Sequence, residues 1–153
     1  MVGAMAHRAL KVFRIGAWAW VVTGVGHLAT AALLASRPED PAASSALVAM
    51  REYGTEIAGV RRSLLDLDRG MSLVMAAALV FGGLVCVLVA RSAPDLVTRS
   101  RSLSGLCLAA SLVVLGLSVW LLPAPPIVLF TIACAAFGRV LATARPEVSA
   151  RPA

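Results

Sequence analysis

The sequence predicts an all-α fold, an integral membrane four-helix bundle with both termini on the cytoplasmic side. Three observations lead to this prediction. The 153 residues are 59% hydrophobic and only 14% charged, and their mean hydropathy is +0.87, which lies outside the range of soluble domains. The charged residues are clustered, and four long apolar runs lie between the clusters. Because the chain has the length of one domain, we expect residues 1–153 to form a single membrane domain.

The four apolar runs predict four spanning helices. A helix needs roughly 20 apolar residues to cross a hydrocarbon core about 30 Å thick. The predicted spans are residues 15–36, 71–90, 103–122 and 127–142. Arg139 lies near the end of the fourth span, where its long side chain can reach the headgroups. The segment "PAPP", residues 123–126, cannot continue a helix and predicts a tight hairpin between the last two spans.

The distribution of basic residues predicts the orientation. Residues 37–69 carry five arginines together with six acidic residues. The other side carries only Asp95 and Glu147 as acids, against nine basic residues: Arg8, Lys11, Arg14, Arg91, Arg99, Arg101, Arg139, Arg145 and Arg151. By the positive-inside rule, both termini face the cytoplasm. The first run is longer than the apolar core of a signal peptide, so we expect a retained anchor helix and a multi-pass protein of the bacterial cytoplasmic (inner) membrane.

The outer loop, residues 37–69, is the longest polar segment and is expected to be partly helical. Ser44 or Ser45 is a suitable N-cap for a short helix over "ALVAMREY", which Gly54 would end. Thr55 then predicts the start of another helix. Apolar residues recur after it at a spacing of three or four, which predicts that this helix runs directly into the second span; they are Ile57, Val60, Leu64, Leu67 and Met71.

Small and weakly polar residues form one stripe on each span, which is typical of membrane helices that pack against each other. On the first span the stripe is Gly16, Trp20, Thr23, His27, Thr30 and Leu34, with Trp18 on the opposite, lipid-facing side. On the second it is Asp68, Ser72, Met75, Leu79, Gly83 and Cys86. On the third it is Ser104, Cys107, Ser111 and Ser118, and on the fourth Thr131, Cys134, Ala135 and Gly138.

His27 is the residue in these stripes that most needs an explanation. It lies twelve residues into the first span, roughly 18 Å at the helical rise, and an ionisable side chain at that depth is a functional candidate. A neutral imidazole satisfied by Thr23, Thr30 or a serine of a neighbouring helix is the structural alternative. Asp68 lies about 13–16 Å further out along the second span, so a direct hydrogen bond between Asp68 and His27 is not expected.

Several kinds of site do not fit the residues present. A bis-histidine haem needs two histidines inside the membrane, and His7 lies in the tail. Cys86, Cys107 and Cys134 lie on three different spans without a CxxC pair, so no zinc site is expected. Cys86 and Cys107 lie near the same membrane face and can approach each other. No glycine-rich phosphate loop, catalytic triad order or intramembrane carboxylate is present. We therefore expect no metal and no cofactor.

Two segments support a resemblance at the level of layout. They are "IGAWAWVVTGVGHL" in the first span and "RRSLLDLDRGMSLVM" at the entrance of the second. With the four-span arrangement, they resemble the broad class of small DoxX-like bacterial membrane proteins. The resemblance covers most of the chain in layout and implies a fold and a membrane location, without implying a reaction.

Three functions remain open from the sequence. In the first, an outward-facing pocket binds a hydrophobic small molecule of isoprenoid, quinone or lipid type, with His27 as general acid or base and Asp68 beside Arg61 at the mouth. The predicted site is His27 and Asp68 as catalytic residues, with the ligand-binding residues Trp20, Thr23, Thr30, Arg61, Ser72, Met75, Ser111, Ser118 and Thr131. In the second, the chain is a non-catalytic subunit or scaffold. In the third, it is a small transporter component that uses His27 as its protonation site.

The same reasoning sets the expected partners. Membrane lipids are expected to contact the chain, and nucleic acid is not. The basic residues flank apolar runs instead of alternating with exposed aromatic residues, which indicates membrane orientation. A hydrophobic small molecule, a second copy of the chain and another membrane protein stay open as partners. Whether the protein is an enzyme also stays open.

Overall fold

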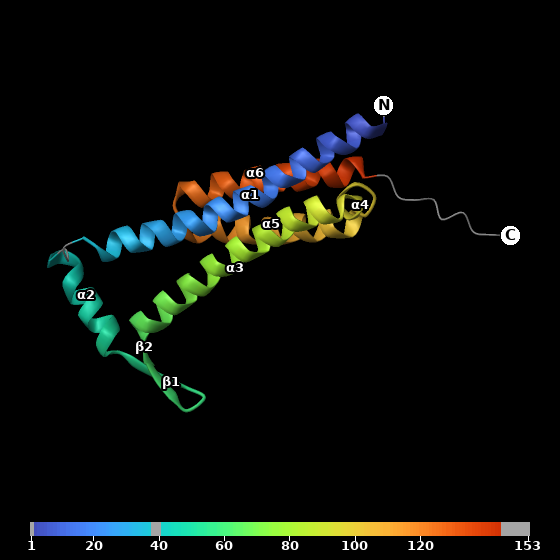
Figure 1. Cartoon of the computed structure of the whole chain (residues 1–153). Helices are drawn as coiled ribbons and strands as arrows, with labels where there is room; N and C mark the ends of the chain where they lie inside the picture. Colours follow the sequence, from blue (N-terminus) through green and yellow to red (C-terminus); the bar gives the residue numbers. More distant parts are fainter. Residues whose placement is uncertain (1, 38–40, 145–153) are drawn as a thin grey trace. The chain divides into compact units, whose positions relative to one another are not determined.

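The computed structural model describes residues 2–37 and 41–144. Figure 1 shows its elements along the chain, and their order is α1 (Val2–Ala35), α2 (Pro41–Glu52), β1 (Gly54–Ile57), β2 (Val60–Ser63), α3 (Leu64–Ser92), α4 (Pro94–Thr98), α5 (Arg101–Leu121) and α6 (Ala124–Thr143). Helices α1, α3, α5 and α6 overlap the four predicted spans, and α1 and α3 begin well before them. Each of them is long and apolar enough to cross a membrane, which confirms the prediction of four long apolar helices.

The apolar surface of these four helices is mostly not covered by protein. In the most apolar window of each helix, only 22% to 28% of the residues are buried. Large apolar side chains therefore lie exposed along the spans, among them Val22, Phe81, Leu106, Val113 and Trp120. Soluble proteins rarely expose apolar surface of this extent. Apolar surface of this extent suits a hydrocarbon environment, as expected for a multi-pass membrane protein.

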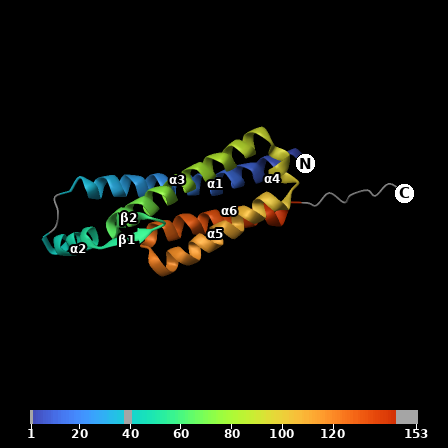
Figure 2. The same cartoon turned by 90° about the horizontal axis from the view of Figure 1, so that it is seen from below.

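The chain forms two compact units, one of residues 1–23 with 79–153 and the other of residues 24–78. The first unit contains the beginning of α1, the second half of α3, and all of α4, α5 and α6. In it, α5 and α6 lie side by side along their length (Figure 2). The reversal between them falls at Pro123, the N-cap of α6. The predicted reversal is confirmed, but α6 begins at Ala124, so Pro125 and Pro126 belong to its first turn instead of to the hairpin.

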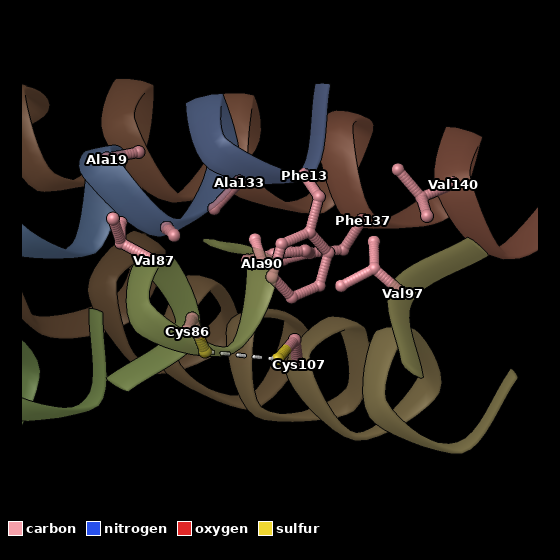
Figure 3. Packing of buried hydrophobic residues seen from close by; sticks show 11 residues of the cluster. Phe13, Ala19, Cys86, Val87, Ala90, Val97, Cys107, Ala133, Phe137 and Val140 are labelled. Atoms are coloured by element: carbon pink, nitrogen blue, oxygen red, sulfur yellow. Dashed lines mark hydrogen bonds between the residues drawn. The ribbon is translucent and has the colours of Figure 1, made fainter. Parts of the chain in front are cut away.

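The core of the first unit is built around two phenylalanines (Figure 3). Phe13 of α1 and Phe137 of α6 are fully buried, and their rings meet edge to face with centroids 5.1 Å apart. Trp20 packs against the same Phe137 ring at 6.0 Å. Small residues surround these rings, because only small residues let helices approach closely in a membrane; they include Ala17, Ala19, Cys86, Ala90, Cys107 and Ala133.

Helices α1 and α3 cross closely at Gly83 within this unit. A Cβ atom at Gly83 would lie 2.7 Å from the carbonyl oxygen of Ala17 and 2.6 Å from a methyl group of Val21. Gly16 lies similarly close to Phe137, at 2.9 Å for a Cβ atom. Both glycines belong to the predicted stripes, and the structure confirms that these positions face other helices.

The predicted stripe of α5 is confirmed, and that of α6 is wrong for two of its four residues. The buried residues of α5 are Ser104, Cys107, Ser111 and Ser118, which are the four predicted. On α6 the buried residues are Phe130, Ala133, Ala136, Phe137 and Val140, whereas the predicted Thr131 and Ala135 are exposed. The physical reason is that two phenylalanines fill the space between the helices better than the small residues beside them, and Thr131 satisfies its hydroxyl on its own helix.

The second unit contains the end of α1, then α2, the β1–β2 hairpin and the beginning of α3. The prediction of a helix from Thr55 into the second span is wrong, since Gly54–Ile57 pairs with Val60–Ser63 as antiparallel strands. Ala58 and Gly59 have φ of 50° and 79°, the backbone of a two-residue hairpin turn that favours glycine at its second position. The apolar spacing from Ile57 to Val60 reflects strand pairing of these two residues.

Helix boundaries in the second unit follow local capping. Helix α2 ends at Glu52, ahead of Gly54, as predicted, but begins at Pro41, so Ser44 and Ser45 lie inside it and are not its N-cap. Helix α3 starts at Leu64, and the Ser63 hydroxyl accepts a hydrogen bond from the Asp66 N–H at 3.1 Å. This is the usual N-cap contact, and it marks the point at which the strand becomes a helix.

Candidate functional site

The eleven predicted site residues are divided between the two units. Five belong to the first unit: Trp20, Thr23, Ser111, Ser118 and Thr131. Six belong to the second: His27, Thr30, Arg61, Asp68, Ser72 and Met75. Their roles in binding or catalysis stay predictions.

Trp20 and Ser111 form the one side-chain hydrogen bond between two predicted site residues in the described part of the chain. The Trp20 Nε1–H donates to Ser111 Oγ at 3.0 Å, and the Ser111 hydroxyl donates to the Cys107 carbonyl at 2.7 Å. Ser111 is fully buried. The bond links α1 to α5, and with both partners occupied Ser111 keeps no proton to donate to a ligand. The Trp20–Ser111 pair therefore contributes to helix packing in this structure.

Cys86 and Cys107 meet beside this pair. Their Sγ atoms are 3.6 Å apart and both side chains are buried (Figure 3). The expectation that the two thiols approach each other is thus confirmed. They contribute a small, polarisable contact between α3 and α5, which is the usual role of a buried free cysteine.

The remaining site residues of the first unit differ in their surroundings. Thr23 is buried, and its hydroxyl donates to the Ala19 carbonyl at 2.8 Å. Thr131 is exposed, and its hydroxyl donates to the Ile127 carbonyl at 2.8 Å. Ser118 is fully buried, and no described residue offers a hydrogen-bond partner to its Oγ. Of these three, only Ser118 keeps an unsatisfied polar atom.

His27 lies in the last third of α1 and is partly buried. Its Nε2 atom is covered, and no described residue reaches it with a hydrogen bond. Thr30, the expected neighbour on the same helix, is exposed and donates to the Gly26 carbonyl at 2.9 Å. Thr23 is bonded to Ala19. The hydroxyls of Thr23 and Thr30, which were expected to bond to the imidazole, therefore donate to backbone carbonyls instead.

The other residues of the second unit lie on α3 and the hairpin. Arg61 is opposite Glu56 in the strand register and packs over Gly54, and both Arg61 and Asp68 are exposed. Met75 lines an open depression of about 680 Å³ along α3. Its other lining residues are Arg62, Asp66, Leu67, Gly70, Met71 and Val74. Asp68 and Ser72 do not line this depression.

A second cavity involves residues that the sequence did not mark as a site. It lies in the first unit, where α1 begins and α6 ends, and has a volume of about 530 Å³. Arg8, Arg99 and Arg139 line it. In the sequence, these arginines indicated only the orientation of the chain. Their clustering depends on bringing the two ends of the chain together, and no local pattern reports that.

Within residues 2–37 and 41–144, no three His, Cys, Asp or Glu side chains gather in a way that could hold a metal ion. Comparisons with family models, with curated proteins and with solved structures found no match to this chain. The resemblance to DoxX-like proteins therefore stays an expectation from the layout of the sequence.

Proposed function

We propose that this membrane protein binds a hydrophobic small molecule of isoprenoid, quinone or lipid type, with His27 as the polar contact of the site. One observation carries the proposal: the His27 Nε2 atom is covered and has no hydrogen-bond partner among the described residues. Leaving a buried polar atom unsatisfied costs about 1–3 kcal/mol. A carbonyl, hydroxyl or water brought by a ligand would recover that free energy.

The surroundings of His27 support an apolar ligand. Apart from Thr23 and Thr30, the residues of α1 around His27 are apolar, and Val25, Leu33 and Leu34 are exposed. The depression along α3 in the same unit is lined mainly by aliphatic side chains, with Arg62 and Asp66 as its charged members. Binding sites for small molecules commonly combine such an apolar wall with a few polar groups. An imidazole can donate or accept a proton, so proton transfer to the ligand is the reaction that this site would support.

Native mass spectrometry of the detergent-purified protein tests the proposal. The variants are His27→Ala and His27→Gln, and the matched control is His7→Gln, which changes the other histidine of the chain at an exposed position of the same helix. We expect wild type and His7→Gln to carry a discrete extra mass and His27→Ala to lose it while remaining folded.

Other outcomes separate the alternatives. If all four proteins are free of ligand, and His27→Ala is less stable while His27→Gln is not, His27 is a structural residue and the scaffold reading holds. If His27→Ala and His27→Gln keep the bound mass, the ligand does not depend on the imidazole and the proposal is wrong. A pH-dependent flux in vesicles that His27→Gln abolishes would favour the transporter reading instead.

A further inference from the structure

The cavity at the end of the first unit has the construction of a binding site. Three segments enclose it: the first turns of α1, α4 with the residue that follows it, and the last turn of α6. Figures 1 and 2 both place these segments at the same end of the unit. Part of its wall is apolar and buried, since Val97, Val140 and Ala144 are 0%, 1% and 3% exposed. The remaining apolar lining comes from Met5, Ala6, Ala9 and Val12.

The charged residues of this cavity are unbalanced. Three arginines line it against one acid, Asp95. Asp95 is already paired with Arg99, with Nε and Oδ1 3.3 Å apart. Arg8 and Arg139 have no ion-pair partner within the described residues and are exposed at the mouth. The site therefore presents two guanidinium groups, from the two ends of the chain, to a ligand that would have to be anionic.

Two side chains donate hydrogen bonds at the carboxyl end of α6, beside the cavity. A helix C-terminus carries unsatisfied carbonyl groups and repels anions. Here the Thr143 hydroxyl donates to the carbonyls of Arg139 and Val140, at 3.0 Å each. The Arg101 Nε–H donates to the Ala144 carbonyl at 3.1 Å. Arg101 and Thr143 thus bring hydrogen-bond donors to carbonyls at this helix end, and the Arg139 guanidinium has no ion pair among the described residues.

We infer that this cavity binds the phosphate headgroup of an anionic phospholipid. Arg8 and Arg139 hold the phosphate oxygens, since guanidinium donors match phosphate geometry, and the glycerol and upper acyl carbons lie against the apolar wall. Seven of the thirteen lining residues are apolar, which a free phosphate would not require. Arg139 lies near the end of a span and Arg8 about two helical turns before another, at headgroup level. Basic pockets at membrane-helix ends on the cytoplasmic side bind such headgroups. The inference does not depend on His27.

Lipid binding to the detergent-purified full chain tests this inference. Native mass spectrometry measures the affinity for phosphatidylglycerol and for phosphatidylcholine with the same acyl chains. The test variant is Arg8→Gln with Arg139→Gln. The matched control is Lys11→Gln with Arg91→Gln, which removes two positive charges from the same predicted membrane face, at exposed residues that do not line the cavity.

We expect one phosphatidylglycerol to bind wild type in preference to phosphatidylcholine. Removing both cavity arginines should weaken phosphatidylglycerol binding about 25-fold, roughly five-fold for each basic residue. The control pair should stay within about two-fold of wild type. Arg139→Lys retains the charge but not the paired donors of the guanidinium, so it should lose less affinity than Arg139→Gln. Thermal unfolding of the double variant beside wild type guards against a loss caused by misfolding.

Competition distinguishes a lipid from a free phosphate. Millimolar glycerol 3-phosphate or inorganic phosphate should leave the bound lipid in place. If either displaces it, the site binds a soluble phosphate and the lipid assignment is overturned. If the test and control variants lose the same affinity for phosphatidylglycerol, the loss reflects diffuse charge at the membrane face, and the inference is overturned. Equal affinity of wild type for the two lipids would overturn the inference as well.

Discussion

At the scale of single residues, two glycines and the Trp20–Ser111 hydrogen bond shape the contacts of α1 in the first unit. Gly83 allows the backbone of α1 to approach α3 at Ala17 and Val21, and Gly16 makes room for the Phe137 ring. The Trp20–Ser111 bond then ties α1 to α5. Interhelical hydrogen bonds of this kind contribute about 0.6 kcal/mol on average in membrane proteins. Close packing at the glycines is therefore expected to contribute more to stability than the hydrogen bond.

Gly83→Ala should destabilise the protein by about 1–3 kcal/mol, the usual cost of overpacking. The added Cβ would meet the Ala17 carbonyl oxygen at 2.7 Å, and a backbone atom cannot rotate out of the way. Thermal unfolding in detergent, followed by circular dichroism, measures this loss. Gly116→Ala is the control, because Gly116 is a glycine of α5 with no heavy atom within 4 Å of its Cβ position. It should be neutral or slightly stabilising. Equal effects of the two substitutions would contradict the close crossing.

At the scale of secondary structure, the segment before α3 shows how a turn overrides an apolar spacing. Ile57, Val60 and Leu64 are spaced as on a helix face, yet the chain reverses at Ala58 and Gly59 and pairs Ile57 with Val60. Thr55, Ile57 and Val60 are β-branched and favour strands. Ser63 then caps the first turn of α3. The local chemistry of a few residues therefore decides the structure of this segment.

The turn residues of the hairpin give an opposed pair of substitutions. Ala58→Asn creates Asn-Gly, the most favourable pair for this turn, and relieves the cost of alanine at a positive φ, which is about 1 kcal/mol. Gly59→Val places a β-branched residue at φ 79° and should destabilise the hairpin by at least that amount. Hydrogen exchange of residues 54–63 measures both: protection should rise about five-fold in the first variant and fall in the second. If residues 54–63 were helical, the two substitutions would not change the hydrogen-exchange protection in opposite directions.

At the scale of the whole molecule, the apolar helices and the distribution of charged residues indicate a membrane protein. Four helices have the length and apolar character to cross a membrane, and their apolar side chains are largely exposed. The basic residues concentrate outside residues 37–69. The positive-inside rule then predicts that the termini and residues 91–102 face the cytoplasm. Residues 37–69 are predicted to face outward.

Cysteine labelling tests this orientation with a matched pair of substitutions, Ser45→Cys and Ser102→Cys. Ser45 lies in α2 and Ser102 at the start of α5, and both serines are exposed. A membrane-impermeant maleimide applied to intact cells should label the Ser45→Cys variant and leave the Ser102→Cys variant unlabelled until the cells are opened. Wild type measures the background from Cys86, Cys107 and Cys134, of which the first two are buried. The reverse pattern would place the termini outside.

Much of the fold could be predicted from the sequence because the responsible properties are local. The number and positions of the long helices follow from apolar runs, and each run finds its matching helix in the structure. The hairpin between α5 and α6 follows from proline chemistry at Pro123. The buried face of α5 also follows, since its Ser and Cys residues at helical spacing contrast with exposed Leu and Val.

Tertiary contacts decided the rest. Thr131 looked like an inward residue, but Phe130 and Phe137 occupy the interior because the ring of Phe137 meets Phe13 and Trp20. Thr23 and Thr30 were suitable partners for His27, yet each hydroxyl bonds its own helix, and Nε2 stays unsatisfied. The cavity with Arg8 and Arg139 joins residues from the two ends of the chain. A sequence pattern reports hydrophobicity and spacing along one helix, whereas a partner on another helix is selected by shape, and shape exists only once the helices pack.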